Sequence, residues 1–261
     1  MVWKGQRFAQ LAHLGTGEHS DVVLAERVDG PAWRLKFKLA TSDDSAKALE
    51  HEATALSVLR ASTLPGSAYF SLRLPHALDF GSVKSDAHAA RATLVMRQAN
   101  GYWGSGADVL IHQRDGIDPR HAVWIWRRLL ETLQFVHTNQ WLHGDIRPGH
   151  LLLHPRDHGV MLIGWSRARQ FDPRERIAAT GKDLAQAAWS IRTLLHGKLD
   201  EQPGYGSRTP APLRELLQSC CEEPAGVASR GAEALAVAVS QAAIAAFGQP
   251  RFIHFDPLSP T

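Results

Sequence analysis

The sequence predicts an α+β fold in which a small antiparallel sheet carrying one helix precedes a larger helical region. Apolar and polar residues alternate over short stretches of the first forty residues, and turn residues separate those stretches. After residue 118, apolar residues recur at helical spacing over most of the chain. With 261 residues, of which 44% are hydrophobic and 21% charged, the chain can bury one core or two smaller ones.

The first forty residues predict three antiparallel strands joined by turns. The strands span residues 8–14, 21–27 and 33–39, and Asp29-Gly30-Pro31 forms the second turn. A helix over residues 45–60 follows, because its apolar residues have helical spacing and Asp43 and Asp44 favour a helix N-terminus there.

Two more strands are expected over residues 76–80 and 92–98, with residues 81–88 between them as a connection. The glycine-rich stretch 100–106 then interrupts all periodicity and indicates a boundary. Beyond it, helices are expected in the four ranges 118–136, 181–196, 211–221 and 231–247. We therefore expect a first lobe over residues 1–98, a second over 99–247 and a tail over 248–261.

Composition excludes several classes of function. The formal net charge is only +3, from 29 Lys and Arg against 26 Asp and Glu, so a nucleic-acid partner is not expected. Cys220 and Cys221 are adjacent, which suits neither a relaxed disulfide nor a metal site and fits a reducing cytosol. No apolar run is long enough to span a membrane and no export signal is present, so a cytoplasmic protein is predicted.

Residues 141–154 carry the most informative motif. His143, Asp145 and Pro148 are followed by the apolar triplet 151–153, and after a turn the segment 160–168 reads Val-Met-Leu-Ile-Gly-Trp-Ser-Arg-Ala. This order resembles the catalytic loop and the following metal-binding segment of protein kinases. The resemblance extends over residues 8–197 and implies a two-lobed, bacterial-type protein kinase-like fold with a nucleotide cleft between the lobes.

The resemblance assigns catalytic roles to two residues and indicates that the two magnesium ligands of the family are missing. Asp145 corresponds to the carboxylate that orients the attacking hydroxyl group, and Arg147 matches the lysine that faces the transferred phosphate. His150 and Gly164 stand where the family has its two magnesium ligands. Imidazole is a poor ligand for magnesium and glycine provides no side chain, so a bound metal is not expected.

The nucleotide-binding half of the resemblance lies near the N-terminus. The residues that it implies are those of a glycine-rich loop, a lysine with its acidic partner and a residue beside the hinge: Gly15, Gly17, Ser20, Val22, Lys36, Glu52 and Met96. Taken alone, Gly15 and Gly17 also fit an ordinary hairpin turn. Lys38 and Glu50 are alternatives to the predicted ion pair between Lys36 and Glu52.

Downstream, Asp183 matches the buried aspartate of the family, whose carboxylate accepts hydrogen bonds from the backbone N–H groups of the catalytic loop. His143 is expected to be a packed structural residue. Only 19 residues separate Gly164 from Asp183, which leaves little room for a regulatory activation loop. Within this interval, four arginines fit either a solvated face or a site for an anionic partner: Arg167, Arg169, Arg174 and Arg176. Arg230 fits either a structural arginine of the family or an exposed residue.

These assignments predict a pseudokinase that acts on an unidentified protein partner as a regulator or scaffold. ATP binding is expected to be weak or absent and independent of magnesium. The alternative is an active atypical kinase, since Lys36, Glu52, Asp145 and Arg147 still form much of a site. A small-molecule or glycolipid substrate is a further alternative, suggested by the sequence His-Leu-Leu-Leu-His at residues 150–154 and by the short segment after Gly164.

Overall fold

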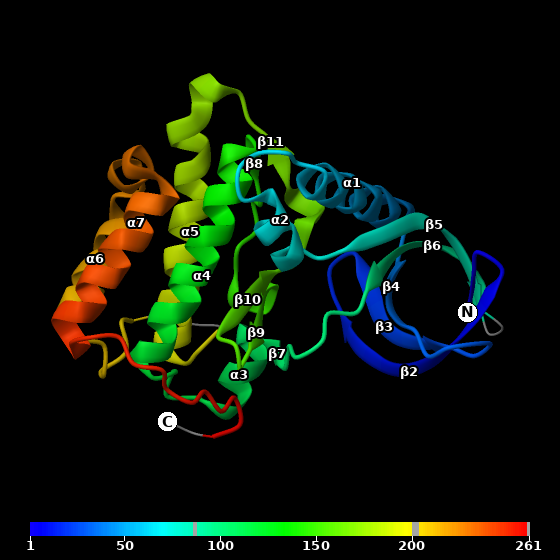
Figure 1. The fold of residues 1–261 in the computed structure, drawn as a ribbon, viewed down its shortest axis with the longest axis horizontal. Helices are drawn as coiled ribbons and strands as arrows, with labels where there is room; N and C mark the ends of the chain where they lie inside the picture. The colour runs from blue at the N-terminus through cyan, green and yellow to red at the C-terminus, as the bar shows by residue number, and fades with distance from the viewer. Residues whose placement is uncertain (86–87, 200–203, 260–261) are drawn as a thin grey trace. The chain divides into compact units, whose positions relative to one another are not determined.

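A computed structural model describes residues 1–85, 88–199 and 204–259 (Figure 1). The chain divides into two compact units. Residues 1–63, 74–100 and 165–168 form the first, and residues 64–73, 101–164 and 169–261 form the second. The chain therefore passes between the units more than once.

The first unit is a closed six-stranded antiparallel barrel with the strand order β1-β2-β3-β4-β6-β5. The strands are β1 (Val2–Trp3), β2 (Gln6–Thr16), β3 (Ser20–Arg27), β4 (Arg34–Ala40), β5 (Ala77–Ser85) and β6 (His88–Arg97). The mixed α+β class is confirmed, and the small antiparallel sheet expected here closes into a barrel, which the sequence analysis did not predict. Closure depends on β1, in which Val2 pairs with Arg7 of β2 and with Lys84 of β5.

The connection predicted over residues 81–88 is wrong for the residues described. Strand β5 continues to Ser85 and β6 begins at His88, and residues 86 and 87 lie outside the described part of the chain. Glycine and serine in this stretch suggested a loop, but Val83 is 2% exposed and belongs to the barrel core. One inward apolar side chain and the pairing with β6 outweigh low strand propensity here.

The barrel core is aromatic and aliphatic, and one helix packs on the barrel. The core contains Trp3, Phe8, Val23, Ala25, Leu35, Phe37, Val83 and Val95. Helix α1 (Asp43–Arg60) is capped at its N-terminus by Ser42, whose side chain accepts a hydrogen bond from the Ser45 N–H.

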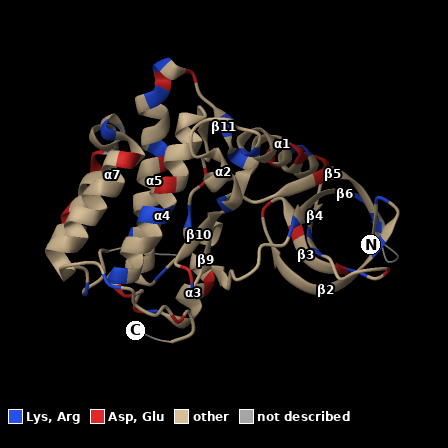
Figure 2. Cartoon of the chain, in the orientation of Figure 1, with Lys and Arg blue, Asp and Glu red and all other residues tan. Residues whose placement is uncertain are grey.

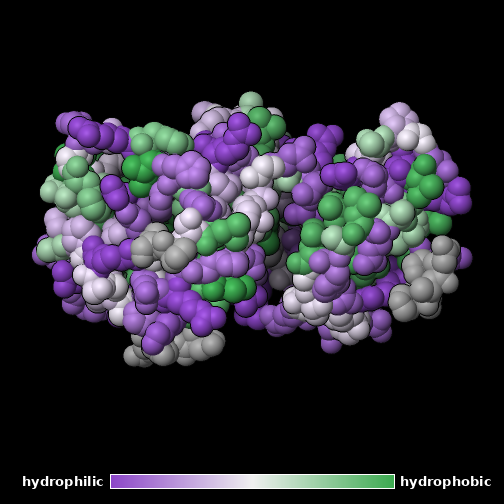
Figure 3. Space-filling view, turned by 90° about the horizontal axis from the view of Figure 1, so that it is seen from below, coloured by the Kyte–Doolittle hydropathy of each residue, from purple (hydrophilic) through white to green (hydrophobic). Residues whose placement is uncertain are grey.

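The barrel also exposes hydrophobic side chains. On β2, Leu11 and Leu14 are 48% and 47% exposed, and Figure 3 shows hydrophobic surface on the barrel.

The second unit is built mainly of helices. Its long helices are α4 (Pro119–Thr138), α5 (Arg176–His196), α6 (Ala211–Glu222) and α7 (Pro224–Phe247). Shorter elements precede and join them: α2 (Ser67–Phe70), η1 (Ser71–Arg73), β7 (Gly104–Ser105), α3 (Gly106–His112), β8 (Trp141–Leu142), η2 (Pro148–His150), β9 (Leu151–His154), β10 (Gly159–Leu162), β11 (Arg169–Gln170) and η4 (Pro173–Glu175). The strands form the sheets β10-β9-β7 and β11-β8. Within the described chain, none of the helices combines the length and apolar composition needed to cross a membrane.

Helix α7 contains a break at Gly231, where φ is 80° and ψ is 172°. This left-handed backbone conformation favours glycine. The helix predicted to start at residue 231 corresponds to the part after the break, and the preceding turns, with Pro224 and Gly226, lack a clear apolar period.

The segment predicted as a tail packs against the second unit. Phe255 is 1% exposed and lies 4.7 Å from the His121 ring, measured between centroids. Phe252 stacks on His158 at 4.4 Å, and His158 stacks on Trp124 at 4.5 Å. Two phenylalanines thus attach the segment predicted as a tail to an aromatic cluster of the second unit.

This cluster gives the fold a dependence on pH. Burial lowers the pKa of His121 to about 4, and its Nδ1 accepts a hydrogen bond from Trp124 Nε1 at 3.1 Å. In the unfolded chain the imidazole titrates near its ordinary value of about 6.5, so the unfolded state gains the proton first as the pH falls. Stability contributed by the neutral ring is complete above that value and is lost as the pH falls toward 4.

We predict that His121→Gln removes part of the acid sensitivity of the free energy of unfolding. Urea denaturation at several pH values between about 7 and 4 should show a larger loss for the wild type, by up to roughly 3 kcal/mol, because only the wild type carries this depressed pKa. Equal losses in the two proteins would contradict the assignment.

Candidate functional site

In the first unit, the predicted glycine-rich loop is the hairpin between β2 and β3. Gly15 has φ of +154° and pairs with Val22, and the Gly17 N–H donates to the Ser20 carbonyl oxygen at 2.8 Å. Ser20 is 4% exposed. A Cβ atom at Gly15 would have no heavy atom within 4 Å, so one side of this backbone is open to an approaching group. The hairpin is thus short, with its glycine backbone accessible.

The predicted ion pair between Lys36 and Glu52 is wrong. Glu52 on α1 is 1% exposed and accepts from Lys38 Nζ at 2.5 Å. Lys36 and Lys38 lie on the same face of β4, since side chains two residues apart point the same way. Alternation therefore could not separate the two lysines, and the position of α1 selects Lys38.

Lys36 instead lies opposite Met96, another predicted nucleotide-binding residue. The two residues are cross-strand partners in the pairing of β4 with β6, and Met96 is 6% exposed. Burial first, and then the charge of Lys38, lower the pKa of Lys36. The first unit therefore holds two neighbouring lysines, and within the described ranges only Lys38 pairs with the buried Glu52 carboxylate.

We predict that Lys38→Met and Lys36→Met have different effects on stability. Lys38→Met leaves the buried Glu52 carboxylate without its cation and should reduce the free energy of unfolding by about 3 kcal/mol. Lys36→Met removes a partly desolvated charge next to Lys38 and should change it by less than about 1 kcal/mol. Urea denaturation of both variants measures the difference. A greater loss of unfolding free energy in Lys36→Met would favour the ion pair predicted between Lys36 and Glu52.

In the second unit, Asp183 of α5 holds the loop that carries Asp145. Asp183 is 1% exposed, and its carboxylate oxygens accept the N–H groups of His143 and Gly144, both at 2.9 Å. His137 Nε2 lies 3.0 Å from Asp183 Oδ2. Burial alone would raise the pKa of Asp183, but the hydrogen bonds from His137 and the His143 backbone outweigh it and lower the pKa. The predicted role of Asp183 is confirmed.

His143 is also placed as predicted, as a buried structural residue. Its exposed fraction is 0%, and burial lowers its pKa to about 4. The neutral ring accepts the Asp145 N–H at Nδ1, at 3.2 Å, and donates from Nε2 to the Ile163 carbonyl oxygen at 3.0 Å. His143 thereby connects the loop of Asp145 to the strand end that precedes Gly164.

The sequence reasoning missed Gln186 and Ser190, which also hold this loop. Gln186 accepts the Ile146 N–H at 3.0 Å and donates to the Gly144 carbonyl oxygen at 3.3 Å. The Ser190 hydroxyl group donates to the Ile146 carbonyl oxygen at 3.2 Å. The signal was present, because residues 183, 186 and 190 are spaced for one face of a helix.

We predict that Asp183→Ala lowers the free energy of unfolding by about 3 kcal/mol, because buried N–H groups of the loop lose their acceptor. Asp157→Ala is a matched control, because the Asp157 side chain is 78% exposed in the same unit, and it should have little effect. Urea denaturation of the two variants checks the expectation, and similar midpoints would oppose it.

Asp145, Arg147 and His150 form a compact group in which His150 is fully engaged. The His150 Nδ1–H donates to the Asp145 carbonyl oxygen at 2.7 Å, and Arg147 Nη2 lies 3.1 Å from His150 Nε2, which accepts from it. Asp145 Oδ2 lies 3.6 Å from Arg147 Nε and 3.5 Å from His150 Nδ1. A carboxylate and an arginine that could contact a phosphate are thus brought together.

The residues present do not fit a magnesium ion at this position. Gly164 has φ of +82° and no side chain, and a Cβ atom there would lie 2.7 Å from His150 Cε1 and Nε2. The imidazole therefore occupies the space that a ligand side chain at residue 164 would need. Both of its nitrogens already make hydrogen bonds, so neither offers a lone pair. Among the described residues, no three His, Cys, Asp or Glu side chains are grouped to hold a metal.

Comparison with known protein families matches residues 68–200, just over half of the chain, to the Lipopolysaccharide kinase (Kdo/WaaP) family. The chain belongs to this family. Lipopolysaccharide kinases are part of the protein kinase-like superfamily, so the resemblance inferred from the sequence is confirmed at that level. No curated protein matches the chain.

The part matched to the lipopolysaccharide kinases covers only one half of the predicted site. It includes Met96, Asp145, Arg147, His150, Gly164 and Asp183, whereas the glycine-rich loop, Lys36, Lys38 and Glu52 lie before it. The catalytic and nucleotide-binding roles assigned to residues in both parts stay predictions.

Proposed function

We propose that this lipopolysaccharide kinase family member is a pseudokinase, a kinase-like domain that regulates or scaffolds an unidentified protein partner without metal-dependent phosphoryl transfer. The observation that carries this proposal is the packing of His150 against Gly164. Phosphoryl transfer requires cations that neutralise the developing charge on the phosphates, and oxygen ligands normally position those cations. At Gly164 no such ligand exists and the His150 ring takes its space.

The proposal separates binding of a phosphate from its transfer. Arg147 provides a guanidinium group that suits phosphate oxygens, and the first unit provides Lys36 and Lys38 on one strand face. Each of these two groups of cations attracts phosphate without magnesium, so weak nucleotide binding that does not need the metal is expected. In the second unit, Asp145 adds a negative charge beside Arg147 that repels a bare triphosphate and keeps binding there weak.

The second candidate is an active kinase that phosphorylates a glycolipid. Two observations favour it: the family match itself, and the retention of Asp145 beside Arg147 at the end of a firmly held loop. This candidate requires a cation to reach the phosphates without a side chain at residue 164. The location in the cytoplasm and the absence of a nucleic-acid partner remain predictions under either candidate.

We predict that magnesium does not increase the stabilisation of the wild-type protein by ATP. The double variant Gly164→Asp/His150→Asn should gain magnesium-dependent stabilisation, because it supplies two oxygen ligands and removes the ring that blocks residue 164. Aspartate tolerates the left-handed backbone at this position better than most residues. Thermal shift measures the effect, since a ligand at about 100 times its dissociation constant stabilises by about 2.7 kcal/mol.

Single variants provide the control. Gly164→Asp alone should lower the melting temperature without creating metal dependence, because its Cβ collides with the intact imidazole. A large magnesium-dependent shift with ATP in the wild type would defeat the pseudokinase proposal. Transfer of labelled phosphate from ATP to lipopolysaccharide by the wild type would establish the glycolipid kinase instead.

A further inference from the structure

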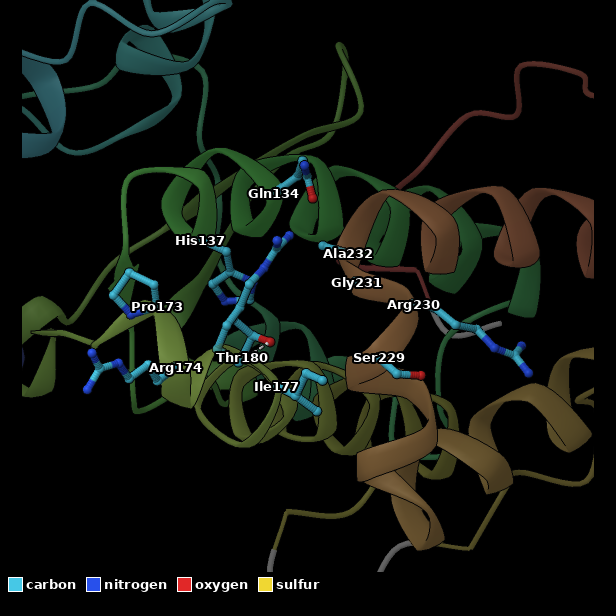
Figure 4. A pocket seen from close by; sticks show the side chains of 11 residues that line it. Gln134, His137, Pro173, Arg174, Ile177, Thr180, Ser229, Arg230, Gly231 and Ala232 are labelled. Carbon is cyan, nitrogen blue, oxygen red and sulfur yellow. Dashed lines mark hydrogen bonds between the residues drawn. The ribbon is translucent and has the colours of Figure 1, made fainter.

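The second unit contains a cavity of about 340 Å³ that lies between three helical segments (Figure 4). Gln134 and His137 of α4 form one side of it, and residues 173–180 of η4 and α5 form another. Residues 229–232, at the break in α7, complete the lining. The cavity is as large as the smaller ligand sites of proteins.

The lining of this cavity is basic. It includes Arg174, Arg176 and Arg230, and no Asp or Glu lines it. In the described ranges, none of the three guanidinium groups forms an ion pair or a hydrogen bond with an acid. Figure 2 shows the basic residues at the start of α5. An anion in the cavity would therefore meet basic side chains and no acidic side chain of the lining.

Nearby acids do not neutralise the cavity. The Asp172 side chain accepts the Arg174 N–H and caps η4. Asp183 is occupied by His137 and by the loop backbone. Both carboxylates therefore have local partners. Neither lines the cavity, and Glu175, which lies between Arg174 and Arg176 in the sequence, does not line it either.

The backbone at Gly231 adds to the positive character. Because Gly231 leaves the helical conformation, α7 restarts at Ala232, and both residues line the cavity. The first N–H groups of a helix lack intrahelical acceptors and carry partial positive charge. A Cβ atom at Gly231 would have no heavy atom within 4 Å, so the backbone there is open to a ligand.

Arg174 and Arg230 are placed at the border of the cavity rather than inside it. In Figure 4, the side chains of Arg174 and Arg230 extend away from the centre in opposite directions, while Ile177 and Thr180 lie between them. Arg174 and Arg230 are exposed, and long exposed side chains change rotamer readily. They can therefore turn toward an anion in the cavity without any change in the fold.

We propose that this cavity binds a phosphate monoester of a small polar molecule, such as a sugar phosphate. The arginines and the backbone N–H groups at the start of the second part of α7 contact the dianionic phosphate. Gln134 and Ser229 supply polar groups that hydrogen-bond to the hydroxyl groups of the sugar. Asp145, Arg147 and His150 do not line the cavity. The site is thus distinct from the candidate catalytic residues, and the inference does not rest on the proposed function.

The test uses isothermal titration calorimetry of the full chain at low salt with glucose 6-phosphate, glucose and inorganic phosphate. Glucose 6-phosphate should bind, glucose should not, and inorganic phosphate should bind more weakly. Arg176→Gln and Arg230→Gln should each weaken binding about tenfold or more, because each removes charged hydrogen-bond donors. Arg169→Gln is the matched control, since Arg169 is an exposed arginine nearby in the chain that does not line the cavity.

Melting temperatures equal to that of the wild type will show that the three arginine substitutions leave the fold intact. The proposal is overturned if glucose 6-phosphate fails to bind at millimolar concentration, or if Arg176→Gln and Arg230→Gln bind it as the wild type does. An equal loss in Arg169→Gln would indicate general charge attraction and would also overturn it. Inorganic phosphate binding as tightly as glucose 6-phosphate would refute the assigned ligand class.

Discussion

The buried carboxylate of Asp183 is the interaction on which the candidate catalytic residues depend. A charge removed from water is costly unless hydrogen bonds compensate it, and here two backbone N–H groups and His137 do so. Those bonds join α4, α5 and the loop before Asp145. The loop itself is irregular, with Gly144 at φ of 79°, so it has no ladder of its own to hold it. Its conformation is therefore imposed by α5.

The conformation of this loop determines where His150 lies relative to Gly164. His143 ties the loop to Ile163, and His150 returns to the Asp145 carbonyl oxygen. The imidazole consequently lies 2.7 Å from where a Cβ atom of residue 164 would be. The two departures from the kinase pattern are thus one packed arrangement, in which glycine makes room for the ring. Replacement at either position alone leaves a collision or a gap.

The sequence allowed the hairpins, the long helices and the role of Asp183 to be predicted, because each has a local period or a motif of fixed spacing. It could not distinguish Lys38 from Lys36, since both lie on one face of β4 and only the placement of α1 decides. Closure of the barrel depends on the two-residue strand Val2–Trp3, which is too short to have a period. The docked chain end depends on Phe252 and Phe255, whose partners are distant in sequence.

The ion pair between Lys38 and Glu52 is better explained by positioning than by stability. A buried ion pair contributes little compared with apolar side chains of the same size, because both charges must be desolvated. Leu35 and Phe37 on the opposite face of β4 already supply the apolar burial of the barrel. What the pair adds is a lysine in a fixed rotamer beside Lys36, whose own pKa is lowered by burial and by that neighbour. Because Lys38 is already paired with Glu52, Lys36 is the lysine of this strand face whose charge is left to attract an anion among the described residues. Under the proposed function, Lys36 would therefore attract a phosphate, while Gly164 supplies no ligand for the metal that transfer requires.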